Sequence, residues 1–294
     1  MIHVLDLEFI GIQEAIGSFL IETSNGPILI ETGPHSTYQN LCRAIKAKGF
    51  EPESIQHVLL THIHLDHAGA AWAFAEKGAK IYVHPAGAKH LASPERLMSS
   101  AKRIYQDKMD ELWGQMNNIP VNQILECQHE EEITIGNTKI TSLHTAGHAT
   151  HHIAWQLDDT IFTGDVAGVK INDGPVVPPC PPPDINIEHW ESSIQLILDK
   201  NPTRLFLTHY GEIRDIQEHM KALRHMLRDW SLWIKDKWEA GLSVEDMTPL
   251  FSSYTRQQLL DQGLDESAVV QYEAANPSWM SVAGLVRYWA KKEN

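Results

Sequence analysis

The sequence contains little cysteine, the residue whose disulfides stabilise small secreted proteins. Only three of its 294 residues are cysteine, and they lie far apart, at Cys42, Cys127 and Cys180. An odd number of cysteines with no Cys-x-x-Cys pair indicates neither a disulfide framework nor a cysteine-based zinc site. We therefore expect a protein of a reducing compartment, with the cytoplasm as the default location.

Basic residues and long apolar runs are also scarce. Lysine and arginine number 24 against 38 aspartates and glutamates, which gives a formal net charge of -14. Nucleic-acid binding usually needs the opposite balance, because lysine and arginine neutralise phosphates. No apolar run approaches the roughly 18 residues of a membrane span, and residues 1–6 lack the basic start of a signal peptide. We expect a small-molecule substrate and neither a nucleic acid nor a membrane as partner, and a homodimer is left open.

Histidine, in contrast, is abundant and clustered. The chain has 17 histidines, which form no terminal run of the kind that a purification tag would give. Three of them lie within residues 62–67, and four more lie within residues 144–152. Histidines that gather beside aspartate indicate a metal site.

Short apolar segments separated by turns predict an α/β protein. In the first third, strands are expected at residues 2–10, 16–22, 27–31, 56–61 and 80–83, and helices at 35–48 and 68–77. Residues 85–118 are more polar and predict helix. Further strands are expected at residues 132–135, 139–144, 153–157, 160–163 and 204–208, with a helix at about 187–200. From about residue 213 only helical patterns remain.

Two later segments differ from the rest in composition. Residues 175–183 contain six prolines, which exclude a helix or a central strand there and favour a stiff loop. The helical tail carries five of the nine tryptophans. We expect the tail to pack on the core, whereas the alternative places some of its rings in a substrate pocket. The predicted domains are residues 1–225 and a helical extension at residues 226–294.

Potential metal ligands follow four of the predicted strands. Residues 61–69 contain His62, His64, Asp66 and His67. Because residues two apart in extended backbone point the same way, His62 and His64 can reach one ion, while Asp66 and His67 can face another position. Three further candidates each follow an apolar strand beside small residues: His148, Asp165 and His209.

This series of motifs resembles the metallo-β-lactamase superfamily over residues 1 to about 225. The resemblance implies an α/β fold of the αββα type, in which two facing sheets lie between helices and the metals lie at one edge. The tail would be an added C-terminal helical region. The resemblance implies a first metal on His62, His64 and His148, a second on Asp66, His67 and His209, and Asp165 as the bridge between them. With Asp165 in place of the cysteine that many true β-lactamases carry, the set is closer to the glyoxalase II-like hydrolases.

The sequence departs from the family pattern at two motifs. The usual Asp-Thr-Gly turn is Glu31-Thr32-Gly33 here, so a longer acid is expected to support the site from behind. The third motif reads Ala146-Gly147-His148, and His152 holds the usual place of a supporting histidine. His151 is an additional histidine, expected on the exposed surface, with a pocket-facing position as the alternative.

Together these features predict a metal-dependent hydrolase with two divalent metal ions. Zinc is expected, and iron or manganese also suit histidine and carboxylate ligands. A hydroxide that bridges the metals would attack an ester, thioester or lactone, with Asp66 and Asp165 as the catalytic carboxylates. The alternatives are a mononuclear iron oxidoreductase of the persulfide dioxygenase type and, outside enzymes, a di-iron redox module.

A proline-rich rim and the helical tail are expected to wall a mostly apolar pocket above the metals, because residues 168–184 follow Asp165 closely and the tail follows His209. Four basic residues on one predicted helix are interpreted as a solvated face and not as a glutathione site: Arg214, Lys221, Arg224 and Arg228.

Overall fold

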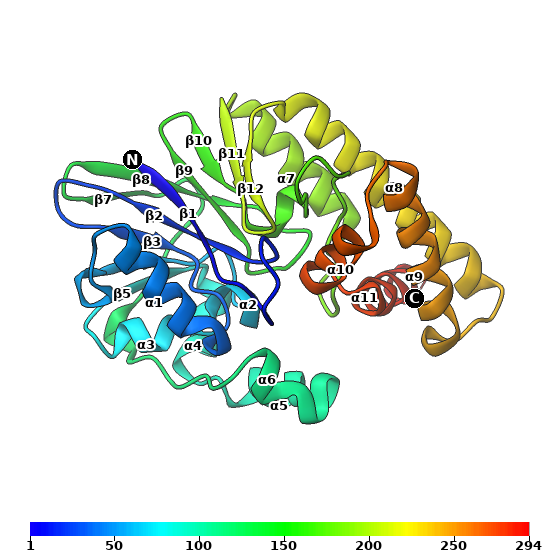
Figure 1. Cartoon of the computed structure of the whole chain (residues 1–294), viewed down its shortest axis with the longest axis horizontal. Coiled ribbons are helices and arrows are strands. Elements are labelled where there is room, and N and C mark those ends of the chain that lie inside the picture. The colour runs from blue at the N-terminus through cyan, green and yellow to red at the C-terminus, as the bar shows by residue number, and fades with distance from the viewer. Residues whose placement is uncertain (294) are drawn as a thin grey trace.

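The computed structural model describes residues 1–293, which form two six-stranded β-sheets stacked face to face with helices on their outer faces (Figure 1). The first sheet has the order β1 (Ile2–Asp6), β2 (Gly17–Ile21), β3 (Ile28–Ile30), β4 (His57–Leu59), β5 (Lys80–Val83) and β6 (Ile124–Glu126). The second has the order β12 (Gly211–Ile213), β11 (Arg204–Leu207), β10 (Thr160–Phe162), β9 (Ile153–Leu157), β8 (Thr138–His144) and β7 (Glu132–Ile135). The predicted αββα class is confirmed.

Alternation along the strands separates two apolar cores. Ile28 and Ile30 of β3 point between the sheets, where they join Phe162 and Trp155 of the second sheet. Leu29, between them in sequence, joins the cluster beneath the helices. Since successive side chains of a strand point to opposite faces, a strand covered on both sides is apolar at every position. This arrangement explains the unbroken apolar runs of the sequence.

Seven helices belong to the first two thirds of the described chain. They are α1 (Tyr38–Ala47), α2 (Leu65–Ala68), α3 (Ala71–Ala75), α4 (Pro85–Ala92), α5 (Glu95–Tyr105), α6 (Met109–Leu112) and α7 (Ile187–Asp199). The single helix predicted at residues 68–77 is in fact two short helices, α2 and α3, and it begins earlier. The short strands β6 and β12 were not predicted. None of the helices in the described part of the chain is long and apolar enough to cross a membrane.

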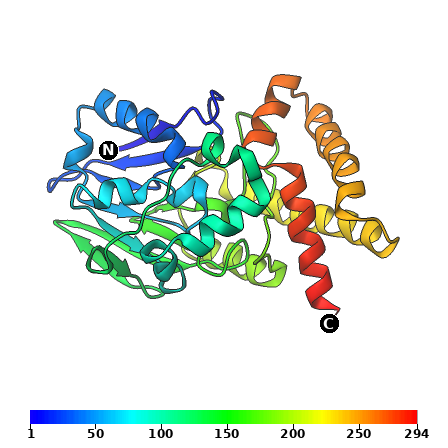
Figure 2. The ribbon, with the colours of Figure 1, turned by 90° about the horizontal axis from the view of Figure 1, so that it is seen from below.

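The C-terminal region consists of four helices beside the sandwich, as Figures 1 and 2 show: α8 (Ile216–Glu239), α9 (Val244–Asp261), α10 (Glu266–Ala275) and α11 (Ser278–Lys292). Tryptophans of α8 pack on α9, with Trp230 edge-on to Phe251 and Trp233 stacked on Tyr254. These rings therefore stabilise the helical region. The division at residue 225 stays a prediction, and α8 continues unbroken through that residue.

The four basic residues near the start of α8 pair with nearby acids. Arg224 and Arg228 both contact Glu191 of α7, at 3.0 and 2.9 Å. Arg214 lies 2.8 Å from Glu212, and Lys221 lies 3.4 Å from Glu218 in the first turn of α8. These contacts agree with the interpretation of a charged face of the helix.

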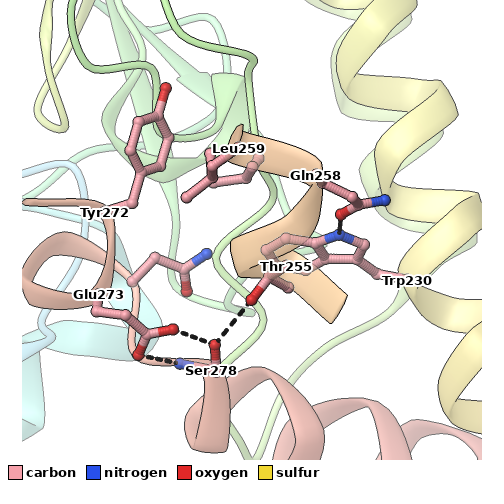
Figure 3. A pocket seen from close by; sticks show the side chains of 9 residues that line it. Trp230, Thr255, Gln258, Leu259, Tyr272, Glu273 and Ser278 are labelled. Carbon is pink, nitrogen blue, oxygen red and sulfur yellow. Dashed lines mark hydrogen bonds between the residues drawn. The ribbon is translucent and has the colours of Figure 1, made fainter. Parts of the chain in front are cut away.

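The proline-rich loop and the tail meet at a small cavity of about 20 Å³ (Figure 3). Val177 of the loop lines it together with residues of the tail, including Trp230, Thr255 and Glu273. Such a volume holds about one water molecule. The junction of the two segments is thus closely packed. The pocket expected above the metals, with these segments as its walls, stays a prediction.

Candidate metal centre

The sheet topology brings the ends of four strands to one edge of the sandwich. Strands β8 and β10 are both antiparallel to β9, and β10 is parallel to β11, so all three have their carboxyl ends at the same edge. The first sheet joins that edge through β4, since the N–H of Ile153 donates to the carbonyl of Thr61 at 2.7 Å. The segments that carry all seven predicted ligands follow these four strands.

Three histidines form a first group. His62 Nε2 lies 2.9 Å from His64 Nδ1, and His148 Nε2 lies 3.0 Å from the same atom. Three imidazole nitrogens that converge in this way can bind one divalent ion.

Asp66, His67 and His209 form a second group. Asp66 Oδ2 lies 3.5 Å from His67 Nε2 and 3.6 Å from His209 Nε2. The group combines one carboxylate with two imidazoles, a ligand set suited to zinc, iron or manganese. Asp66 and His67 lie in α2. The ring of His67 is centred 4.0 Å from that of His62, so the second group directly adjoins the first.

Asp165 lies between the two groups and directs one oxygen to each. Its Oδ2 is 3.2 Å from His148 Nε2, whereas its Oδ1 is 3.2 Å from His67 Nε2 and 3.4 Å from His209 Nε2. Gly164 makes this position possible, because its φ is +50° and a Cβ there would come within 2.5 Å of Thr61 Oγ1. The geometry is that of a carboxylate able to bridge two ions.

Backbone carbonyls orient two of the histidines. His148 Nδ1 donates to Pro179 O at 2.8 Å, and His209 Nδ1 donates to Ala15 O at 2.7 Å. A proton on Nδ1 leaves the lone pair on Nε2, which in both residues faces the centre. Ligating histidines are usually fixed by such contacts.

Several buried polar atoms at the centre have no hydrogen-bond partner among residues 1–293, and together they fit a metal. They include both ring nitrogens of His67, Nε2 of His209 and Oδ1 of Asp165. A buried polar atom without a partner is costly, and a cation satisfies carboxylate and imidazole lone pairs together. The donors are nitrogen and oxygen only, which suits zinc, iron or manganese.

The electrostatics of the first group favour neutral imidazoles. Burial lowers the pKa of His64 to about 4, and the nearby His148 acts in the same direction. Burial likewise holds the pKa of His62 well below its usual range. A metal binds the neutral form of histidine, so these residues need to lose no proton near pH 7.

In the second group, nearby negative charges outweigh the effect of burial on a histidine pKa. Burial lowers the pKa of His67, but the charges of Asp165, Asp66 and Glu31 outweigh it and raise that pKa well above its usual value. For Asp165, burial raises the pKa, yet His67, His148 and His209 hold it well below its usual range. Asp165 is therefore a carboxylate. A cation among these groups would take over the role of the proton on His67.

Glu31 supports the centre from behind, as its place in the altered turn suggested. It is fully buried, and its φ of +64° is a backbone conformation that non-glycine residues seldom adopt. Its Oε1 accepts from the N–H of Thr61 at 3.1 Å and lies 3.5 Å from His67 Nδ1. The carboxylate thereby links the ligand loop to His67.

We expect Glu31→Gln to lower metal affinity by about 10- to 100-fold, the usual cost of losing a group that orients a ligand. The amide keeps the size of the side chain but loses the charge beside His67. Chelator competition measures the effect, with Glu76→Gln, an exposed position at the end of α3, as the control. Equal affinities of the Glu31 variant and the unmodified protein would show that Glu31 has only a packing role.

His151 is buried, whereas we mainly expected it on the exposed surface. Only 8% of its surface is exposed, and its ring is centred 5.5 Å from that of His64. Burial occurs because α4 covers it: a Cβ on Gly87 would lie 3.7 Å from the His151 Cβ. His152 is fully buried, and its Nε2 accepts from the backbone N–H of Asp165 at 3.2 Å. His152 therefore positions Asp165 through the backbone.

An α/β sandwich with a buried histidine–aspartate centre at one edge defines the class to which this protein belongs. The model of the metallo-beta-lactamase superfamily matches residues 14–209. The chain belongs to this superfamily, whose members are generally metal-dependent and hydrolytic.

Named relatives share smaller parts of the sequence. The metallo-beta-lactamase fold-containing protein ST1585 of Sulfurisphaera tokodaii is 28% identical over an alignment of 177 residues, which covers 58% of this chain and 67% of that protein. An N-acyl homoserine lactonase of a Bacillus species is 32% identical over an alignment of 79 residues, which covers 19% of this chain and 32% of the lactonase. The matched segment therefore spans about a third of the lactonase.

One solved structure matches almost the whole chain in fold. The metallo-beta-lactamase family protein TTHA1429 of Thermus thermophilus has a TM-score of 0.65 at 16% identity, over 99% of this chain and 94% of its own. The similarity in fold thus includes the C-terminal helices.

Proposed function

We propose that this protein is a hydrolase with two divalent metal ions, most suitably zinc, which acts on an uncharged ester, lactone or thioester. The observation that carries the proposal is the position of Asp165, with one carboxylate oxygen facing each ligand group. A centre for one ion would need no such arrangement. The glyoxalase II-like ligand set inferred from the sequence belongs to the same proposal.

Each ion would have its own side chains. His62, His64 and His148 would hold the first ion, and Asp66, His67 and His209 the second, while Asp165 would contact both. When bound, the two cations would polarise the substrate carbonyl and lower the pKa of water towards neutrality. With such chemistry at the centre, the chain needs no serine or cysteine nucleophile.

Asp66 is suited to accept a proton during the reaction. Its side chain is 22% exposed, whereas that of Asp165 is 4% exposed. The flanking His67 and His209 overcome the effect of burial and hold the pKa of Asp66 well below its usual range, so the carboxylate is charged. A charged and partly exposed carboxylate at the centre can accept a proton from water.

An aromatic group around Tyr105, which lies within electrostatic reach of Asp66, supports an apolar substrate. Tyr105 of α5 contacts Trp113 and Trp279, with ring centroids 5.0 and 5.7 Å away, and Phe9 stacks on Trp113. Burial first, and then the charge of Asp66, raise the pKa of the Tyr105 hydroxyl, which remains protonated. Aromatic rings with one polar hydroxyl favour an acyl or ring ester over a charged substrate. The resemblance to an N-acyl homoserine lactonase also favours an acyl or ring ester as substrate.

A substrate panel tests this proposal. We expect the fully metallated protein to hydrolyse uncharged esters, thioesters or lactones and to leave single-stranded DNA and RNA intact. Tyr105→Phe should raise KM or lower kcat, while Tyr254→Phe, on the far helix α9, should leave both unchanged. Rapid cleavage of nucleic acid without any esterase or lactonase activity would refute the assignment.

A further inference from the structure

The residues that follow Val177 can make few hydrogen bonds of their own. Residues 178–183 contain five prolines and one other residue, Cys180, so the segment has a single backbone N–H. It nevertheless carries the carbonyl of Pro179, which accepts from His148 Nδ1 at 2.8 Å. Something outside the segment must therefore fix that carbonyl.

The C-terminal helices supply the missing contacts. Asn276 Nδ2 donates to Pro178 O at 3.2 Å, and the one backbone N–H of the segment, on Cys180, donates to Ser281 Oγ at 3.4 Å. Arg287 and Lys291 of α11 both donate to Pro183 O. Four hydrogen bonds thus reach the segment from the tail, on both sides of Pro179.

Asn276 and Ser281 also orient each other. Asn276 lies where α10 ends, and its Oδ1 accepts from Ser281 Oγ at 3.3 Å, so its amide nitrogen is left for Pro178 O. Asn276 is 7% exposed and Ser281 is fully buried. Because neither side chain is free to rotate into solvent, each has one arrangement in which all these bonds form.

The backbone of α11 lies directly against Cys180. A Cβ added to Gly284 would be 1.9 Å from Cys180 O, so only glycine permits this approach. Cys180 and the neighbouring Leu285 are fully buried. The contact is tight enough to transmit the position of the helix to the proline segment.

From these contacts we propose that Asn276 and Ser281 are positioning residues of the first ligand group. They hold residues 178–180 in place, the carbonyl of Pro179 then fixes the ring of His148, and His148 Nε2 faces the ion. The C-terminal helices would thus form part of the metal centre although they contribute no ligand. The inference rests on the two-metal assignment of the proposed function.

The test measures the affinity of each metal equivalent by chelator competition in Asn276→Ala and Ser281→Ala. We expect one equivalent to bind about 10-fold more weakly and the other to be unchanged, since loss of an orienting partner costs about 10- to 100-fold. Thr255→Val is the control, because Thr255 is also 7% exposed in this region but bonds only to Ser252 and Ser278. In a His148→Ala background, Asn276→Ala should have no further effect.

Equal weakening of both equivalents, the same loss in Thr255→Val, or unchanged affinity in both tail variants would overturn the proposal. A second readout does not depend on metal. In the metal-free protein, the Nδ1–H of His148 should give a protected NMR signal that shifts or exchanges faster in Asn276→Ala or Ser281→Ala. An unaltered signal also counts against the proposal. Absence of metal from the unmodified protein would instead remove the proposed function, and the NMR result would still decide the positioning role.

Discussion

Replacing Asp165 with asparagine is expected to lower hydrolysis by at least about 100-fold and to release at least one metal ion. Loss of a group that merely orients a ligand already costs about 10- to 100-fold, and Asp165 is itself placed as the shared ligand. Asparagine has nearly the same shape, but it has no charge and offers one oxygen in place of two. The asparagine oxygen could then contribute to only one of the two ligand groups.

Two measurements together check this expectation: metal content by elemental analysis and the initial rate on the best ester or lactone substrate. Asp173→Asn is the matched control, because Asp173 lies exposed in a turn of the following loop. It should keep both the metal and the rate. An Asp165→Asn protein with two metal equivalents and a near-normal rate would contradict the bridging role.

Exhaustive chelation is expected to abolish hydrolysis and to lower the unfolding temperature. The stability lost depends on the metal concentration: a ligand present at 100-fold its Kd stabilises the folded state by about 2.7 kcal/mol, and at 1,000-fold by about 4.1 kcal/mol. Without a cation, the buried nitrogens of His67 and Oδ1 of Asp165 have no hydrogen-bond partner in the described part of the chain. Both activity and stability should return when metal is added back.

Thermal unfolding and rate measurements at several concentrations of added zinc provide the check. The unfolding temperature should rise with free zinc in the unmodified protein and rise less in a His67→Ala variant, which keeps only one complete ligand group. If chelation left the rate unchanged while metal analysis proved its removal, catalysis would not depend on the centre.

The side chains that gather at the candidate metal centre were predictable from sequence because each lies in a segment that follows a strand. Residues 62–67 combine four donor side chains in one short loop, and parallel strand ends meet at one edge of a sheet, so local pattern and topology agree. The helical tail was also predictable, because only helical patterns remain after about residue 213. In these regions the local sequence pattern is sufficient to predict the secondary structure.

Other features depend on contacts between distant segments. His151 is buried because Gly87 lets α4 approach it. Nothing in the sequence around either residue predicts this contact. The strands β6 and β12 have three residues each and gain their conformation from pairing with a neighbour. The hydrogen bond from Asn276 to the carbonyl of Pro178 joins residues 98 positions apart, which no local pattern could indicate.

The central claim is that two metal ions at one centre carry out hydrolysis, and one combined measurement addresses it most directly. The purified protein is reconstituted separately with zinc and with iron, and metal per chain, ester or lactone hydrolysis and oxygen uptake with a persulfide are recorded on the same samples. We predict two equivalents per chain, hydrolysis that increases until both are bound, and no oxygen uptake. One tightly bound iron per chain with oxygen uptake on persulfides, and no hydrolysis in either sample, would contradict the account and favour a mononuclear iron oxidoreductase.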